Sequence, residues 1–138
     1  MTDIDDIRML TARYNRAGDS DDRDAWLACF APDGSFGRVD LGTEHRGLEA
    51  IARMSDGYPV HGRHVTVDHI IEVEVDGDRA TQTCTLLFFD AERGYALHMV
   101  GTYDDTLVRR DGHWLFLDRR LTANFLAQDD SRRAKGDS

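Results

Sequence analysis

A change of hydrophobic period near residue 60 constrains the fold of this chain more than any other feature. Before it, apolar residues recur every three or four positions, as in Ile7, Leu10, Tyr14 and Ala17, which is the spacing of one helix face. After it, apolar and polar residues alternate, which is the spacing of strands. The first part therefore predicts helices, and the second part predicts long strands joined by short turns.

The predicted elements follow from these two periods and from the turn residues between them. We expect helices over residues 3–17, from about 21 to 30 and from 48 to around Gly57 and Pro59, a turn over 31–34, a short strand over 35–39 and a loop over 42–47. Strands are expected over residues 65–75, interrupted near His69, and over 80–89, 95–109 and 114–125. Asp76-Gly77-Asp78 and Arg110-Asp111-Gly112 are hairpin signals between them.

Helices followed by a meander of long strands predict an α+β fold. A strongly curved antiparallel sheet can wrap around the N-terminal helices and form a cone-shaped barrel with one pocket. The length of 138 residues is that of one domain, which we place at residues 1–126. Residues 127–138 lack large apolar side chains and are predicted to be a disordered tail.

Composition excludes several classes of function. A formal net charge of -9 argues against nucleic acid or an anionic membrane as a partner. No apolar run is long enough to span a bilayer, and the acidic beginning of the sequence resembles neither a secretory signal nor a transit peptide, so a cytoplasmic protein is expected. The two cysteines, Cys29 and Cys84, have no metal-binding or redox spacing and are expected to be buried thiols.

The acidic run that begins at Asp19 is the first candidate for chemistry. Asp19 follows Tyr14 by five residues, and His64 stands at the start of the first long strand. A histidine titrates near neutral pH, and a carboxylate behind it fixes its tautomer and stabilises the imidazolium, so the two can act as an acid/base pair. Three alternatives stay open: Asp19 as a cap between helices, His64 as a surface residue and Tyr14 as core. The sharp expectation is that Asp19 is buried and bonded to His64, while Asp21 and Asp22 are solvated.

Several short motifs, in this order and spacing, resemble the SnoaL-like branch of the NTF2-like superfamily over about residues 4–125. They are Tyr14-x-x-Ala17-x-Asp19-x-x-Asp22, Phe30-Ala31-Pro32-Asp33-Gly34, Gly47-x-x-x-Ile51, Gly77-Asp78-x-Ala80, Gly101-x-Tyr103-x-Asp105 and Arg109-Arg110-Asp111-Gly112-His113-Trp114-x-Phe116. Members of that superfamily include scytalone dehydratase, a hexachlorocyclohexane dehydrochlorinase and a bile-acid dehydratase. They are lyases that need no cofactor, but the same fold also carries other activities and non-catalytic proteins.

The resemblance implies roles for four residues. Asp19 and His64 match the catalytic Asp and His of these enzymes, and Tyr14 matches a catalytic Tyr of the bile-acid enzyme. Arg119 stands where the dehydrochlorinase has a functional Arg, and it points to the opposite face of its strand from Arg120. The chain departs from scytalone dehydratase where that enzyme has a second His, since this position falls near Asp90, and where it has a polar pair, near Thr102 and Asp104.

Substrate-binding residues are expected on the inward faces of the strands and of the second helix. These candidates are Trp26, Leu86, Phe88, Asp90, His98 and Met99. Two alternatives stay open: a turn role for Asp90, and a place for His98 on either the pocket wall or an oligomer face. His61, His64 and His69 are not expected to form a metal site. On an extended strand His64 faces the opposite way from both His61 and His69, so the three side chains do not converge. No metal and no cofactor is expected.

These observations predict a cofactor-independent lyase or isomerase, similar to a dehydratase or a polyketide cyclase. It would act on a small, largely apolar molecule of polyketide or steroid type through Asp19 and His64. The alternatives are a small-molecule-binding or assembly module with an inert pocket, and the companion of a larger oxygenase. A homodimer or homotrimer is expected, because the outer sheet face, with Thr83, Thr85 and Leu87, needs a cover.

Overall fold

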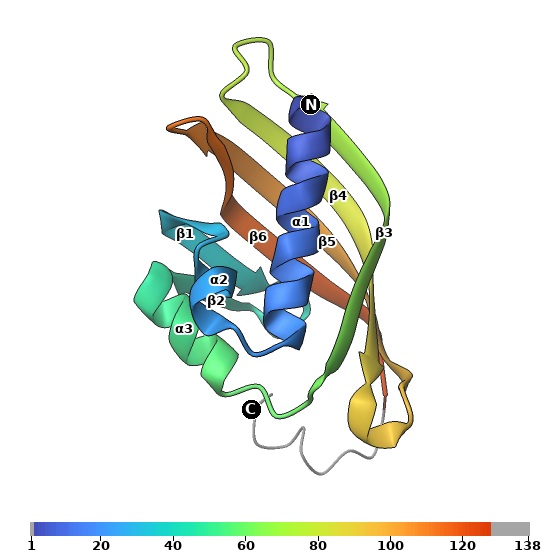
Figure 1. Cartoon of the computed structure of the whole chain (residues 1–138). Coiled ribbons are helices and arrows are strands. Elements are labelled where there is room, and N and C mark those ends of the chain that lie inside the picture. The colour runs from blue at the N-terminus through green and yellow to red at the C-terminus, as the bar shows by residue number, and fades with distance from the viewer. Residues whose placement is uncertain (1, 128–138) are drawn as a thin grey trace.

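The computed structural model describes residues 2–127, and the predicted tail lies outside this range but for Ala127. Helices come first and long strands last, as the change of period predicts (Figure 1). The elements are α1 (Asp3–Asp19), α2 (Arg23–Leu27), β1 (Phe30–Arg38), the 3-10 turn η1 (Val39–Leu41), β2 (Thr43–Arg46), α3 (Leu48–Asp56), β3 (Gly62–Val73), β4 (Arg79–Asp90), the 3-10 turn η2 (Ala91–Arg93), β5 (Ala96–Arg110) and β6 (His113–Leu126). The described residues contain no helix long and apolar enough to cross a membrane.

The strands form one curved, six-stranded sheet in the order β2-β1-β6-β5-β4-β3. Strands β3 to β6 are the predicted antiparallel meander, and α1 runs along its concave side (Figure 1). The α+β prediction with a curved sheet around the N-terminal helices is confirmed. The sheet is mixed rather than wholly antiparallel, because β1 pairs with β6 in parallel, and it does not close.

Several local predictions before residue 60 are wrong. The predicted loop over residues 42–47 contains β2, an edge strand of exposed polar residues that carries no hydrophobic alternation. The predicted turn over residues 31–34 lies inside β1, where it appears as a register shift between Phe30 and Ser35. The first helix does not end at residue 17 but continues through Asp19, and the second ends at Leu27 instead of Phe30.

The alternation of β4 places its residues as predicted. Cys84, Leu86 and Phe88 are buried in the core, where they face α1, while Thr83 is exposed and Thr85 and Leu87 are half-buried on the convex side. That convex side is the surface on which a homodimer or homotrimer was expected, and self-association stays a prediction.

A bulge in β3 decides which of its side chains face inward. Asp68 has a positive φ of 57°, and the pairing with β4 shifts between Val67 and Ile70. An extra residue reverses the alternation on one side of the bulge. On a regular strand Val65 and Ile71, six positions apart, would lie on the same face. Here Ile71 is half-buried, whereas Val65 is 37% exposed. Because Val65 points outward, His64 points inward.

Candidate functional site

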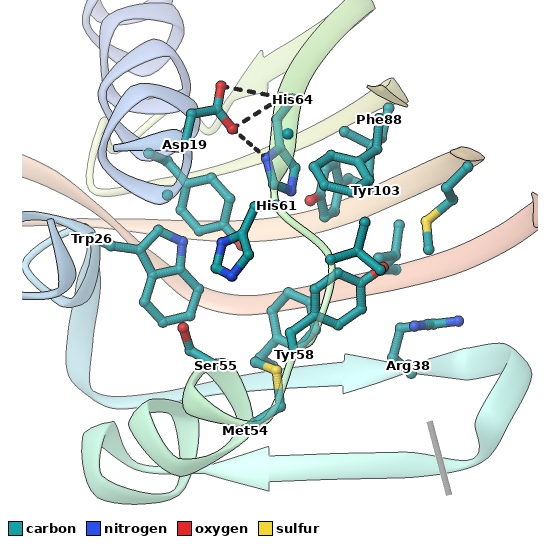
Figure 2. A pocket seen from close by; sticks show the side chains of 18 of the residues that line it. Asp19, Trp26, Arg38, Met54, Ser55, Tyr58, His61, His64, Phe88 and Tyr103 are labelled. Atoms are coloured by element: carbon teal, nitrogen blue, oxygen red, sulfur yellow. Dashed lines mark hydrogen bonds and ion pairs between the residues drawn. The ribbon is translucent and has the colours of Figure 1, made fainter. Parts of the chain in front are cut away.

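A cavity of about 180 Å³ opens between the C-terminal end of α1, α3 and the concave side of the sheet (Figure 2). Most of its wall is apolar or aromatic, and four of its ionisable side chains, Asp19, Asp21, His61 and His64, lie where α1 ends and β3 begins. Its lining comprises Tyr14, Gly18, Asp19, Asp21, Trp26, Phe36, Arg38, Met54, Ser55, Tyr58, Val60, His61, Gly62, His64, Leu86, Phe88, Met99, Tyr103 and Leu121. Such a cavity suits a small, mostly apolar molecule with a few polar contacts.

Asp19 and His64 meet at this cavity. The Asp19 Oδ1 atom lies 2.6 Å from Nδ1 of the imidazole, and both carboxylate oxygens accept the backbone N–H of His64, at 3.0 and 3.1 Å (Figure 2). The two side chains keep 16% and 28% of their surface exposed, so the pair is half-buried rather than sealed. Asp21 and Asp22 are exposed, as expected.

These contacts select one tautomer of His64. An ionised carboxylate can only accept hydrogen bonds, so Nδ1 carries the proton that it donates to Asp19. The lone pair of the neutral ring then belongs to Nε2, which points away from Asp19 toward the cavity (Figure 2). Phe88 packs against the imidazole, with ring centroids 4.4 Å apart, and holds its plane. The arrangement can accept a proton from a molecule in the cavity.

Asp19 occupies a position that helix stability alone would not favour. It is the last residue of α1, and the C-terminal end of a helix carries partial negative charge that disfavours an anion. The helix closes just beyond it, where Ser20 donates its backbone N–H to the carbonyl of Arg16. The three hydrogen-bond contacts from His64 offset this local cost. A carboxylate that is kept here against the helix dipole marks a candidate functional residue.

Tyr14 and Tyr103 form an aromatic wall of the cavity, and Tyr103 was absent from the sequence-based candidates. Their rings pack edge to face at 6.4 Å. Burial raises the pKa of both phenols, and the positive charge of Arg119 opposes this rise. Both tyrosines therefore keep their protons at neutral pH and can act as hydrogen-bond donors. The inward position of Tyr103 was predictable from the alternation of its strand.

Arg119 lies one layer behind these tyrosines. Its side chain is fully buried, does not line the cavity and pairs with Asp105 at 3.1 Å. Its guanidinium carbon lies 3.5 Å from the ring centroid of Tyr103 and 4.3 Å from that of Tyr14. The sequence-based expectation that Arg119 meets the substrate is therefore not supported by its position. Periodicity showed only that Arg119 and Arg120 face opposite ways, and the resemblance favoured Arg119 as the inward residue; neither gives the depth of the guanidinium, which the aromatic rings cover.

The substrate-binding candidates divide into two groups. Trp26, Leu86, Phe88 and Met99 line the cavity, but Asp90 and His98 are buried outside it. Asp90 has the turn role that was left open, since its carboxylate accepts the backbone N–H of Glu92 at 3.0 Å and caps η2. His98 packs edge-on behind Phe88, with ring centroids 5.8 Å apart.

His61 was wrongly placed by sequence reasoning. It was expected to face away from His64, but β3 begins only at Gly62, so strand alternation does not apply to it. Both histidines line the cavity. Tyr58 and Arg38 also line it and were missed, since one follows the end of a helix and the other ends a strand at a turn. Within residues 2–127, no three His, Cys, Asp or Glu side chains are grouped to hold a metal ion.

Comparison with solved structures supports the fold. A protein of unknown function from Mycobacterium tuberculosis is 32% identical, with a TM-score of 0.81 over 97% of this chain and 80% of that one. A scytalone dehydratase-like protein from Novosphingobium aromaticivorans shares the fold, with 19% identity and a TM-score of 0.79 over 92% of this chain and 87% of that one. ActVI-ORFA from Streptomyces coelicolor also shares it, with 19% identity and a TM-score of 0.75 over 88% of this chain and 97% of that one. No curated protein matches the chain.

The match to a family model is the more specific result. The model of the SnoaL-like domain matches residues 1–120, which include every residue of the cavity lining except Leu121. The chain therefore belongs to the family of SnoaL-like domains.

Proposed function

We propose that this protein is a cofactor-independent enzyme that removes a proton from a small, largely apolar carbonyl compound, as a dehydratase, isomerase or cyclase does. The observation that carries the proposal is the 2.6 Å contact between Asp19 and Nδ1 of His64 at an apolar cavity. Membership of the SnoaL-like family is consistent with chemistry of this kind. His64 is the base in this mechanism, and Asp19 holds its tautomer and balances the charge of the imidazolium.

The size of the cavity limits the substrate. An apolar cavity of about 150 Å³ accommodates benzene. The 180 Å³ cavity here takes one or two fused rings in its interior, and a longer molecule would extend through the mouth. Tyr14 or Tyr103 donates a hydrogen bond to the carbonyl oxygen as negative charge develops on it. A preorganised donor of this kind contributes about 2.7–4 kcal/mol to transition-state stabilisation.

Base-promoted ring opening of 5-nitrobenzisoxazole tests the proposal. This flat, two-ring compound loses one proton from carbon, and its phenolate product is followed by absorbance. We expect His64→Gln to lower the rate by about 100-fold or more, since a positioned base contributes at least that much. Asp19→Asn is expected to lower it at least tenfold, because an amide no longer restricts the ring to one tautomer.

His113→Gln is the matched control, since His113 is an exposed histidine that does not line this cavity. A wild-type rate no higher than that of His64→Gln would contradict the proposal. If wild-type protein then bound 1-tetralone, detected by quenching of tryptophan fluorescence that is lost in Trp26→Phe, the result would favour a small-molecule-binding module.

A further inference from the structure

His61 is a second histidine at the same cavity, held by a different segment from His64. Its carbonyl oxygen accepts the backbone N–H of Ala91 at 3.0 Å, which fixes the chain just before β3 begins. The imidazole lies over the cavity between Trp26 and Tyr58 (Figure 2). Its side chain keeps 62% of its surface exposed, so it faces both the cavity and solvent.

Each of the two histidines has its own carboxylate. Nδ1 of His61 lies 3.7 Å from Oδ1 of Asp21, two residues after Asp19 in the segment that joins α1 to α2. Asp21 has a positive φ of 57°, a conformation that costs a non-glycine residue free energy and occurs at functional sites. The His61–Asp21 contact is looser than the 2.6 Å His64–Asp19 contact and is far more exposed. His61 can therefore exchange protons with solvent and still reach a molecule in the cavity.

Elimination of water needs two proton transfers: one proton is removed from a carbon, and another is delivered to the hydroxyl oxygen on the neighbouring carbon. If His64 were the only histidine involved, it would have to carry out both transfers. We propose that His61 is the general acid that protonates the leaving hydroxyl group of a β-hydroxy carbonyl substrate; this inference rests on the proposed role of His64 as base. His64 takes the proton from the carbon next to the carbonyl, and that C–H electron pair becomes the new C=C bond. The C–O pair leaves with oxygen, which takes the proton of His61 and departs as water. Proton exchange with solvent then restores both histidines.

Two compounds separate the acid from the base. 3-Hydroxy-1-tetralone loses water to give 1-naphthol and needs a protonated leaving group. 5-Nitrobenzisoxazole opens to a stable phenolate and needs only the base. We expect His61→Gln to lower the dehydration rate by about 100-fold or more, and to lower the ring-opening rate far less, because ring opening needs no protonated leaving group. His64→Gln is expected to lower both rates, and His113→Gln neither.

The possible outcomes distinguish the two proposals. Unchanged dehydration in His61→Gln, or an equal loss of both reactions, overturns the role of His61 and leaves His64 as the base. Unchanged ring opening in His64→Gln, or wild-type protein inactive toward both compounds, overturns the proposed function and with it the role of His61. A ring-opening activity without any dehydration in the wild type overturns the role of His61 alone. Because His61 is largely exposed, its glutamine variant should fold normally, which thermal denaturation checks.

Discussion

Replacement of Arg119 by methionine should destabilise the protein strongly, because it leaves a buried charge without its partner. The guanidinium is fully buried and lies 3.1 Å from the carboxylate of Asp105, which is itself 4% exposed. Loss of one member of a buried ion pair costs about 3–5 kcal/mol of unfolding free energy. At roughly 3–5 °C per kcal/mol for a chain of this length, the midpoint of thermal unfolding should fall by about 9–25 °C.

The neighbouring residue supplies the control. Arg120 lies on the opposite face of β6 and pairs with Asp118 at 2.8 Å, with more than half of its side chain exposed. Arg120→Met should therefore lower the free energy of unfolding by less than about 1 kcal/mol. The double variant Asp105→Asn, Arg119→Met removes both charges but keeps an acceptor for Gln82, whose amide donates to Asp105 at 2.9 Å. It should be more stable than Arg119→Met alone.

Urea unfolding, followed by tryptophan fluorescence, measures the loss of unfolding free energy in Arg119→Met, in Arg120→Met and in the double variant. Equal costs for Arg119→Met and Arg120→Met, or a double variant less stable than Arg119→Met, would refute the buried-pair argument. An Arg119→Met variant of wild-type stability with a raised KM for 5-nitrobenzisoxazole would instead restore Arg119 as a substrate contact. The experiment thus distinguishes a residue that supports the cavity wall from one that touches the substrate.

Three further predictions follow from burial and close packing. Gly62→Ala should lower the free energy of unfolding by about 1–3 kcal/mol, because its Cβ would lie 1.8 Å from a backbone oxygen of β4. Gly57→Ala is the control, since its Cβ would have no neighbouring atom nearer than 3.6 Å and the variant should unfold in urea like wild type. Equal effects of the two substitutions would contradict this prediction. Burial raises the pKa of both Cys29 and Cys84 to about 11, so neither thiol should react with a disulfide reagent at pH 8 until urea unfolds the protein; rapid labelling of native protein would contradict it. Burial also raises the pKa of Asp105 from 3.8 to about 6, against the attraction of Arg119, so its contribution to stability is fully present below pH 3.8 and is lost as the pH rises through 6. That shift corresponds to about 3 kcal/mol, and the stability of wild type relative to Asp105→Asn should fall by about that amount as the pH rises from 3.8 to 6. A difference independent of pH would contradict it.

The strands of the second half were predictable because their side chains alternate between core and solvent. In β4 the sequence pattern alone separates Cys84, Leu86 and Phe88 from Thr83 and Thr85. The strand β2 was not predictable, since its four residues are mostly exposed and show no alternation. The parallel pairing of β1 with β6 joins segments about 80 residues apart, and no local pattern records such a partner.

The candidate site was predictable where it depended on strand or helix faces, and unpredictable where it depended on boundaries and depth. Tyr14, Leu86 and Phe88 lie on inward faces and line the cavity. His61 does so because β3 starts one residue after it, and a shift of one residue in that boundary reverses the predicted side. Arg119 has the correct face, but the aromatic rings in front of it separate it from the cavity.

The contact between Asp19 and His64 depends on local choices that oppose stability on each side of it. Asp19 places a carboxylate at the negative end of α1, and Asp21 and Asp68 adopt positive φ without being glycine. Each such backbone conformation costs about 1–3 kcal/mol. The turn at Asp21 follows the end of α1 at Asp19, and the bulge at Asp68 reverses the alternation that would otherwise send His64 outward. The other two non-glycine residues with positive φ, Tyr95 and Asp111, lie in turns elsewhere, so backbone strain alone does not mark the site. The carboxylate kept at the negative end of α1 is the feature expected of a site maintained for its chemistry and not for the stability of the fold.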